Sequence, residues 1–298
     1  MNAVQADGLR EPLARWRSYA KALVATAFWG LSFVAVRIAL EGVRPLGLVW
    51  MRSALGALLL FGMLRARGEP LLPERADRPR CTLMGLILGV HLLVQTLALR
   101  LTTAVRAGWI IAFVPVVVAL FSALLLGRRL RAPGWAGIAL STAGVLALTA
   151  VRPGALPQAG WGDLMVLSTC FLWASYALLS FAPMQRSGAL RTTAWSMAVA
   201  ALPNLLAAVA DGTLRESPSV RSLVAVLFLG VGASAIAMWA FSSAVHDLGP
   251  ERASAFQYVQ PFVTLAGSAV FLDEPMTRGM LASGPVVLLG VWLIQRSK

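Results

Sequence analysis

The sequence has few of the residues that build metal centres, disulfides and nucleotide sites. Its two cysteines, Cys81 and Cys170, both lie in apolar runs, which predicts neither a disulfide nor a metal site. It contains no His-Glu-x-x-His motif and no glycine-rich nucleotide loop. Only 13% of its residues are charged. We therefore predict no metal, no cofactor and no catalytic residues.

Long apolar runs are abundant instead. Hydrophobic residues make up 58% of the 298-residue chain, and a run of about 20 apolar residues is long enough to cross a ~30 Å hydrocarbon layer as a helix. Clusters of glycine, proline and charged residues separate ten such runs. The sequence therefore predicts an all-α membrane protein with ten spans. The expected spans are 20–40, 46–64, 81–99, 104–126, 133–151, 161–181, 192–210, 222–245, 252–272 and 278–295.

The second half of the chain repeats the first. Residues 95–145 match residues 241–291 at a constant shift of 146 positions, which aligns Arg106 with Arg252 and Pro115 with Pro261. The predicted units are residues 20–151 and 161–295. Because each unit has an odd number of spans, five, the second unit must enter the bilayer from the opposite side. We expect two inverted repeats.

Basic residues are distributed unevenly between the two expected faces. Seventeen of the 26 Lys and Arg residues fall on the face that holds the N-terminus, and six on the other. This bias predicts that both termini, including the segment 1–19, are cytoplasmic, in the inner membrane of a bacterium. The first apolar run continues to Leu40, too long for a signal peptide. The net charge of +13 then reflects topology and contact with lipid headgroups rather than nucleic-acid binding.

Several motifs resemble the drug/metabolite transporter superfamily in its EamA-type branch. They are Phe28-Trp29-Gly30-Leu31-Ser32-Phe33, Arg52, Ala98 to Ala104 with Pro115, Gly162-Asp163 with Trp173-Ala174 and Tyr176, and Phe271-Leu272-Asp273-Glu274-Pro275 with Gly290-Val291. The resemblance implies ten helices around a central cavity and export of metabolites, amino acids or drugs. The family often has an acidic residue after the glycine that closes span four. Here Gly127 is followed by Arg128 and Arg129, while Glu274 keeps the equivalent place in the second half.

Polar residues interrupt span nine on one side. Gln257, Gln260, Thr264 and Ser268 are spaced by three or four residues and so share a helical face. Pro115 and Pro261 each remove a backbone donor near mid-membrane, which suits a hinge or a binding site. A packing kink, with the amides bonded to neighbouring helices, is the alternative interpretation.

Further candidates for a substrate cavity are aromatic or titratable. His91, with Gln95 one turn later, could bind a coupling proton or could be a neutral histidine bonded to a neighbouring helix. Arg52 and Arg106 would either extend outward to water or hold a substrate carboxylate. Arg37 is placed to pair with Glu41. The aromatic candidates, which ordinary helix packing would also explain, are Trp29, Phe33, Trp109, Phe113, Trp173, Tyr176, Trp239 and Tyr258.

No Asp or Glu lies well inside a predicted span, which argues against strictly cationic substrates. An amino acid or a similar neutral or zwitterionic solute fits better, exchanged by alternating access of the two repeats. The alternatives are a proton-coupled multidrug efflux pump, a channel, and an intramembrane enzyme. The last would need Ser234 and His246, which lie ~18 Å apart along one helix. We expect a monomer, although Gly85 and Gly89 would allow a dimer contact.

Overall fold

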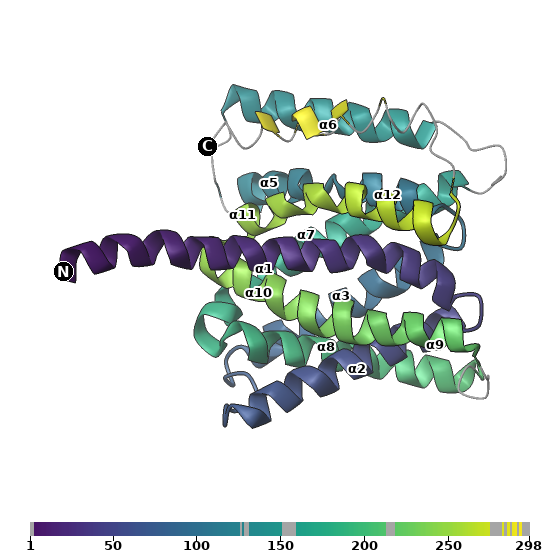
Figure 1. The fold of residues 1–298 in the computed structure, drawn as a ribbon, viewed down its shortest axis with the longest axis horizontal. Coiled ribbons are helices and arrows are strands. Elements are labelled where there is room, and N and C mark those ends of the chain that lie inside the picture. Colours follow the sequence, from purple (N-terminus) through teal and green to yellow (C-terminus); the bar gives the residue numbers. More distant parts are fainter. Residues whose placement is uncertain are drawn as a thin grey trace.

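A computed structural model describes residues 3–125, 127, 131–150, 159–212 and 218–274, and residues 282, 285, 286, 288–290, 292 and 293. Every secondary-structure element in these ranges is helical, which confirms the all-α prediction for them (Figure 1). The uninterrupted long helices are α1 (Ala3–Ala39), α2 (Pro45–Ala66), α3 (Arg78–Ala98), α6 (Ala132–Ala150), α7 (Ala159–Ser187) and α8 (Ala189–Ala210).

The helix starts follow local chemistry. Pro45 occupies the first turn of α2, where its missing N–H costs no hydrogen bond. Gly188 separates α7 from α8 with a φ of 83°, a conformation that favours glycine because it has no Cβ. Thr103 caps the N-terminus of α4 (Ala104–Ile111): its hydroxyl accepts from the backbone N–H of Arg106 at 3.2 Å.

Two predicted spans are broken in the middle, each just before its proline. The fourth consists of α4 and α5 (Val114–Leu125), separated by Ala112 and Phe113. The ninth consists of α11 (Pro250–Ala255), the 3₁₀ segment η3 (Phe256–Val259) and α12 (Gln260–Phe271). Shifted by the repeat of 146 residues, the first break falls on 258–259, inside the second. The repeat therefore extends to the backbone irregularities.

The eighth predicted span is continuous but changes its winding. It runs through α9 (Val220–Leu227), the π-helical segment η2 (Phe228–Ile236) and α10 (Ala237–Leu248). A π-helical stretch widens the turn and rotates the side chains beyond it. Ser234 lies in this stretch.

Seven helical segments of the described residues are long and apolar enough to cross a membrane. They correspond to predicted spans one to four and six to eight. The first crosses with Trp16–Ala39, although α1 already begins at Ala3, inside the segment expected to precede the membrane. Helix α6 and the α11–η3–α12 segment, at the fifth and ninth predicted spans, are not among the seven. Most of the tenth, 278–295, lies outside the described residues.

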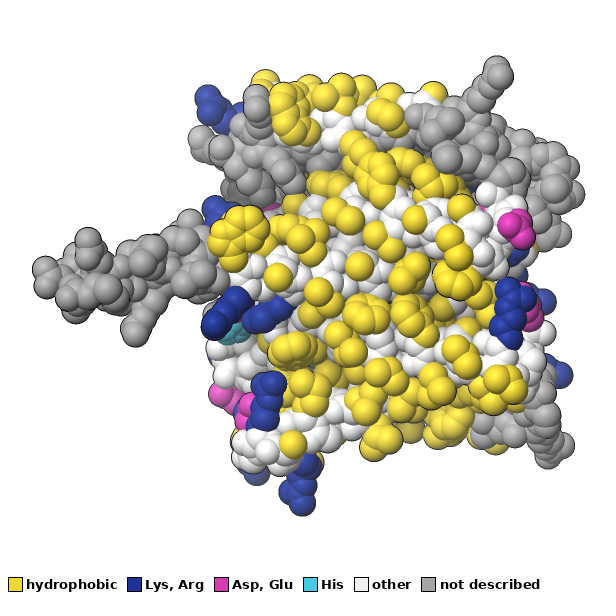
Figure 2. Space-filling view, viewed as in Figure 1, with side chains coloured by type: hydrophobic (Ala, Val, Ile, Leu, Met, Phe, Trp, Pro, Cys, Tyr) yellow, Lys and Arg dark blue, Asp and Glu magenta, His cyan; other side chains and the backbone are white. Residues whose placement is uncertain are grey.

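The surface separates apolar from charged side chains. In Figure 2 the visible face carries hydrophobic side chains across its middle, and Lys, Arg, Asp and Glu gather at the two ends of the bundle. We call the end where α1 enters the bundle, with Lys21 and Asp247, the near end. The opposite end, with Arg37 and Asp163, is the far end. This band of apolar side chains is the part that a bilayer would surround.

Contacts at the two ends fix the direction of each helix. At the near end, Ser18 at the start of α1's membrane part bonds to Asp247, and Gln185 at the end of α7 bonds to the carbonyl of His246. At the far end, Arg37 near the end of α1 donates to the carbonyl of Thr102 at 3.4 Å. The Thr102 side chain in turn bonds Asp163 at the start of α7. Helices α1 and α7 therefore run in opposite directions.

The third helix of each half shows the same relationship. Asp77, just before α3, bonds Arg186 at the near end. Arg221, at the start of α9, pairs with Glu41 at the far end at 3.5 Å. Helix α3 therefore starts at the near end, where the continuous α9–η2–α10 helix finishes with Asp247 in α10.

Glycines bring α3 and α8 close together. A Cβ atom on Gly85 would lie 2.5 Å from the Cβ of Val199, and one on Gly89 would lie 3.2 Å from the carbonyl oxygen of Ala200. The Gly-x-x-x-Gly pair therefore serves a contact inside this chain. These two glycines therefore give no support to a contact between two copies of the chain.

Candidate functional site

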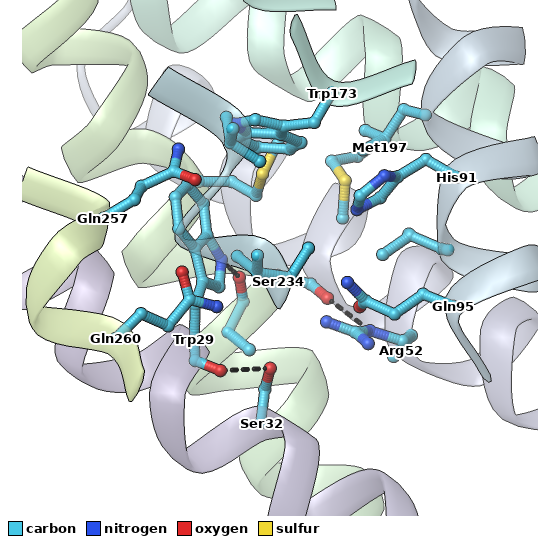
Figure 3. A pocket seen from close by; sticks show the side chains of 16 residues that line it. Trp29, Ser32, Arg52, His91, Gln95, Trp173, Met197, Ser234, Gln257 and Gln260 are labelled. Atoms are coloured by element: carbon cyan, nitrogen blue, oxygen red, sulfur yellow. Dashed lines mark hydrogen bonds between the residues drawn. The ribbon is translucent and has the colours of Figure 1, made fainter. Parts of the chain in front are cut away.

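A pocket lies inside the bundle, between helices of both halves of the chain (Figure 3). Its volume is about 40 Å³, which is room for a few water molecules. An amino acid would need more space, so the pocket must widen to admit one. The lining residues come from both halves of the chain. They are Trp29, Ser32, Arg52, Leu88, His91, Leu92, Gln95, Ile111, Val114, Trp173, Met197, Ala233, Ser234, Met238, Gln257 and Gln260.

The structure brings together seven of the residues that the sequence analysis selected. They are Trp29, Arg52, His91, Gln95, Trp173, Gln257 and Gln260. Five helical segments supply them, from α1, α2, α3, α7 and the η3–α12 junction. Their contact with a substrate stays a prediction.

The other candidates lie outside the pocket lining. Tyr176 stacks on Trp173, with ring centroids 5.3 Å apart, and supports that ring from behind. Trp109 packs edge-on against Phe262, and Trp239 lies under the guanidinium of Arg67 at 5.9 Å. Phe33 and Phe113 are buried in the apolar core, and Tyr258 is half-buried against it. These side chains act through packing in this structure.

The polar stripe on the ninth span also divides. Gln257 and Gln260 reach the pocket, whereas the hydroxyl of Thr264 donates to the carbonyl of Gly30 on α1 at 2.9 Å. Ser268 is buried one turn further along. One helical face therefore serves the pocket at one end and helix packing at the other.

The sequence analysis did not select Ser32, Met197 or Met238 for the pocket, and it considered Ser234 only as a residue of the enzyme alternative. Methionines in an apolar run carry no signal that separates a pocket wall from the core. Ser234 could have been found from Gly230 and Gly232, because two glycines and a serine in an apolar run mark a close approach between helices. A Cβ on Gly230 would lie 2.5 Å from Leu55 on α2.

Aromatic rings form one wall. The Trp29 and Trp173 rings meet edge-to-face at 80°, with centroids 4.9 Å apart, and Phe241 lies 5.0 Å from Trp29. The Trp29 indole donates to the carbonyl of Ala233 at 3.1 Å, which fixes its orientation. The His91 ring lies 5.3 Å from Trp173. Such faces attract apolar groups and cations.

Arg52 supplies the charge of the pocket. Its side chain is buried, its Nε donates to the Oγ of Ser234 at 3.1 Å, and its Nη1 has no hydrogen-bond partner. None of the described residues that line the pocket is Asp or Glu. A buried guanidinium without a counter-charge is costly in a membrane, so this position favours an anionic group from the ligand.

Other polar atoms here also lack partners. The Nε1 of Trp173 and the Nε2 of Gln257 are unpaired donors, and the Oε1 of Gln260 is an unpaired acceptor. Figure 3 places the two glutamines on one side of the pocket and Arg52 with Gln95 on the other. Unpaired buried groups are expensive unless a ligand or water satisfies them.

His91 is held in one tautomer. Its Nδ1 lies 3.1 Å from the carbonyl oxygen of Thr169, which can only accept. Nδ1 therefore carries the hydrogen and Nε2 is the nitrogen that can accept one. Both interpretations of His91, the bonded neutral histidine and the proton site, are compatible with this contact.

Arg106 takes neither of its two expected roles. It does not extend to water, because its side chain is 0% exposed, and it is not among the residues that line the pocket. Its Nε donates to both carboxylate oxygens of Asp163, at 3.0 and 3.2 Å. Arg37 likewise pairs with Glu274 at 3.8 Å rather than with Glu41, which pairs with Arg221.

The residues of the enzyme alternative are not placed together. The Ser234 hydroxyl is in the pocket and accepts from Arg52, whereas His246 is at the near end, with its Nδ1 2.9 Å from Asp247. Within the described ranges, no three His, Cys, Asp or Glu side chains form a group that could hold a metal ion.

The chain matches a known family twice. The model of the EamA-like transporter family matches residues 16–150 and again residues 160–296. The two matches together cover nearly the whole chain. This confirms the resemblance drawn from the sequence motifs.

Similar proteins carry transporter names. The chain is 26% identical over 273 residues to the "Uncharacterized inner membrane transporter YedA" of Escherichia coli strain K12, covering 89% of this chain and 88% of that protein. It is 25% identical over 289 residues to the "Probable amino-acid metabolite efflux pump" of Salmonella typhimurium strain LT2, covering 91% and 92%. A crystal structure that is 22% identical superposes with a TM-score of 0.71 over 94% of this chain, which supports the fold alone.

Proposed function

The chain belongs to the EamA-like transporter family, and from that premise we propose that it exports amino acids or amino-acid-like zwitterionic metabolites across a bacterial inner membrane. A relative of similar length is named as a probable amino-acid metabolite efflux pump. At 25% identity that name suggests a substrate class without fixing it.

The single observation that carries the proposal is the uncompensated charge of Arg52. The guanidinium is buried in the pocket wall, and its Nη1 is unpaired. A carboxylate can accept two parallel N–H bonds from one guanidinium, which satisfies both its charge and its geometry. A substrate carboxylate at Arg52 would therefore stabilise the loaded pocket more than the empty one.

The opposite side of the pocket suits the other end of a zwitterion. The Oε1 of Gln260 is an unpaired acceptor and the rings of Trp29 and Trp173 are close by. An ammonium group can donate to an amide oxygen and lie against aromatic faces. Leu88, Leu92 and Met197 complete an apolar lining for an uncharged side chain.

Inverted repeats support alternating access as the mechanism. Helices α1 and α7, and likewise α3 and the α9–α10 helix, occupy equivalent places in the two units and run in opposite directions. The rocking of two such halves about a central site opens it to either face in turn. The breaks before Pro115 and Pro261 lie beside the pocket and would serve as hinges. We keep ten spans, as units 20–151 and 161–295, and a monomer as part of this proposal.

The basic residues support an orientation with the near end and both termini in the cytoplasm. Two exposed positions test it: Arg75 in the loop before α3, and Val220 at the start of α9, 78% exposed. Cys81 and Cys170 are buried and should react little. In intact cells an impermeant thiol reagent should label Val220→Cys and not Arg75→Cys. Labelling of both cysteines from outside would contradict the inverted topology.

Transport by purified protein tests the substrate. Protein in liposomes should take up radiolabelled amino acids faster than empty liposomes, with saturable rates, and amino acids should raise its unfolding temperature. Uptake no faster than in empty liposomes would exclude the amino-acid proposal. A flux that rises linearly with concentration would indicate a channel.

A proton-coupled multidrug pump is the second candidate, favoured by the aromatic wall beside His91. Its substrates would be large and often cationic, and Arg52 would repel a cation in the same pocket. A thermal-shift screen that includes toxic cations separates the two. Stabilisation by cations and not by amino acids would favour the pump.

A further inference from the structure

Two hydroxyl–carboxylate hydrogen bonds close the bundle, one at each end. At the far end the hydroxyl of Thr102 donates to Asp163 at 2.6 Å. At the near end the hydroxyl of Ser18 donates to Asp247 at 2.6 Å. Each bond joins residues far apart in the chain and links one half of the molecule to the other.

The two bonds occupy equivalent places in the two repeats. Ser18 lies two residues after the first family match begins at 16, and Asp163 lies three residues after the second begins at 160. The repeat shift of 146 places Asp247 opposite Leu101, the neighbour of Thr102. Each bond therefore joins the first helix of one unit to the region where the third helix of the other unit ends: Asp247 lies in the last turn of α10, and Thr102 in the turn after α3. In the far-end bond the first helix supplies the carboxylate, Asp163, whereas in the near-end bond the first helix supplies the hydroxyl, Ser18.

The far-end contact is the more buried of the two. Asp163 also accepts hydrogen bonds from the guanidinium of Arg106, and both side chains are 0% exposed. Glu274 adds a second carboxylate: its two oxygens accept from the backbone N–H groups of Ala104 and Val105, each at 3.1 Å. These are free donors at the first turn of α4, where negative charge is favourable. Glu274 thereby ties the end of α12 to the start of α4.

The near-end contact is open to water. Asp247 meets Lys21 at 3.4 Å, and both side chains are 34% exposed. His246 also reaches its second oxygen at 2.9 Å. Solvent weakens an exposed ion pair, whereas a buried pair cannot be broken without leaving a charge unpaired.

We infer that these clusters are the two gates of the transporter: Thr102, Arg106, Asp163 and Glu274 at the far end, and Ser18, Lys21 and Asp247 at the near end. The inference rests on the proposed alternating access. Because the far gate is buried and charge-paired, it holds while the near gate opens. The empty transporter therefore rests open to the near end, the cytoplasmic side.

A cysteine in the pocket reports which gate is open. Ser32 lines the pocket, and Ser32→Cys changes only one atom. An impermeant charged thiol reagent is applied outside intact cells and, separately, to inside-out vesicles. With both gates intact, labelling should be faster in the inside-out vesicles. Faster labelling from outside would overturn the assignment of the resting state.

Variants of the far gate should reverse this preference. Glu274→Gln removes the carboxylate cap, and Arg106→Gln with Asp163→Asn removes both charges of the pair together, so that neither is left alone. Each should raise the labelling rate from outside by about tenfold. Glu69→Gln is the matched control, because the Arg67–Glu69 pair lies within one unit. The far gate would be overturned if these variants elute from a sizing column and unfold at the same temperature as the parent, yet are labelled from outside at an unchanged rate.

A crosslink tests the near gate without weakening the fold. Ser18→Cys with Asp247→Cys should form a disulfide on oxidation, stop transport, and recover on reduction. Transport that continues in the crosslinked protein would overturn the near gate even where the far-gate variants fail to fold. Pocket labelling needs no substrate, so a changed labelling pattern without amino-acid transport would reject the proposed substrate and keep the gates.

Discussion

Arg52 on α2 and Ser234 on η2 join the two halves of the molecule inside the pocket: the guanidinium Nε donates to the hydroxyl at 3.1 Å. The serine holds one side of the guanidinium and leaves Nη1 without a partner. It fixes the orientation of the charge without neutralising it. An anchored and uncompensated cation is suited to bind an anion that comes and goes.

Replacing Arg52 should therefore weaken substrate binding. Arg52→Gln removes a charge-assisted contact of about 1.5–3 kcal/mol, or roughly ten- to hundredfold in affinity. Arg52→Lys should restore only part of it, because an ammonium cannot form two parallel bonds to a carboxylate. Binding is measured by the ligand-dependent rise in unfolding temperature and by uptake in liposomes.

Arg100 offers the control. It is an exposed arginine at the far end, and Arg100→Gln should leave both measurements unchanged. Equal affinity for amino acids in Arg52→Gln and in the parent would mean that the carboxylate binds elsewhere.

Close helix packing gives a second prediction. A Cβ on Gly85 would lie 2.5 Å from the Cβ of Val199 and 2.8 Å from the carbonyl oxygen of Ser196, and backbone cannot move aside cheaply. Gly85→Ala should cost about 1–3 kcal/mol by overpacking. Gly62 on α2 has no atom within 4 Å of a new Cβ, so Gly62→Ala should be neutral or stabilising by up to about 1 kcal/mol. Thermal unfolding in detergent separates the pair, and equal unfolding temperatures would contradict the α3–α8 contact.

The fold was accessible from sequence where one physical constraint dominates. Apolar length predicts the membrane helices because lipid demands internally satisfied backbone. Pro115 and Pro261 predict interrupted helices because neither can donate to the preceding turn. The bond network at the helix ends has no such local signature. Glu274 caps α4 from 169 residues away in the chain.

The two buried arginines show what sequence leaves open in the site. Arg52 and Arg106 both interrupt apolar runs and carry the same alternatives. Only the fold brings Asp163, 57 residues from Arg106, to one of them. The glutamines of the ninth span could be selected because they share a helical face, whereas Met197 and Ser234 reach the pocket through packing between helices.

His91 gives a prediction about energy coupling. Its Nδ1–H is engaged by the Thr169 carbonyl, so Nε2 is the atom that could take up a proton on the pocket side. Glutamine keeps a donor at this position but does not titrate. His91→Gln should abolish accumulation driven by a pH gradient, while exchange of substrate between the two sides of the membrane continues. His246→Gln, the other histidine, lies at the near end and should keep gradient dependence. Gradient-driven accumulation that persists in His91→Gln excludes the role.

Asp77 gives the pH dependence of stability. Hydrogen bonds from Arg186 and Ser187 hold the pKa of this carboxyl below its usual range. A carboxyl whose pKa is lower in the folded state stabilises the fold above its unfolded pKa of about 3.9. That stabilisation is lost as the pH falls through the folded pKa. Because Arg186 is 52% exposed, the charge contribution should stay near 1 kcal/mol or less.

Asp77→Asn should therefore lower the unfolding temperature at pH 7, and the difference from the parent should shrink as the pH falls below about 4 and through the lowered pKa of Asp77, because the carboxyl then becomes uncharged like the amide. Glu69→Gln is the control, because its pair with Arg67 is exposed on both sides and spans 3.9 Å. It should show no difference at either pH. A deficit in Asp77→Asn of the same size at both pH values would mean that packing and the Ser187 bond stabilise this end, and that the charge of Asp77 does not.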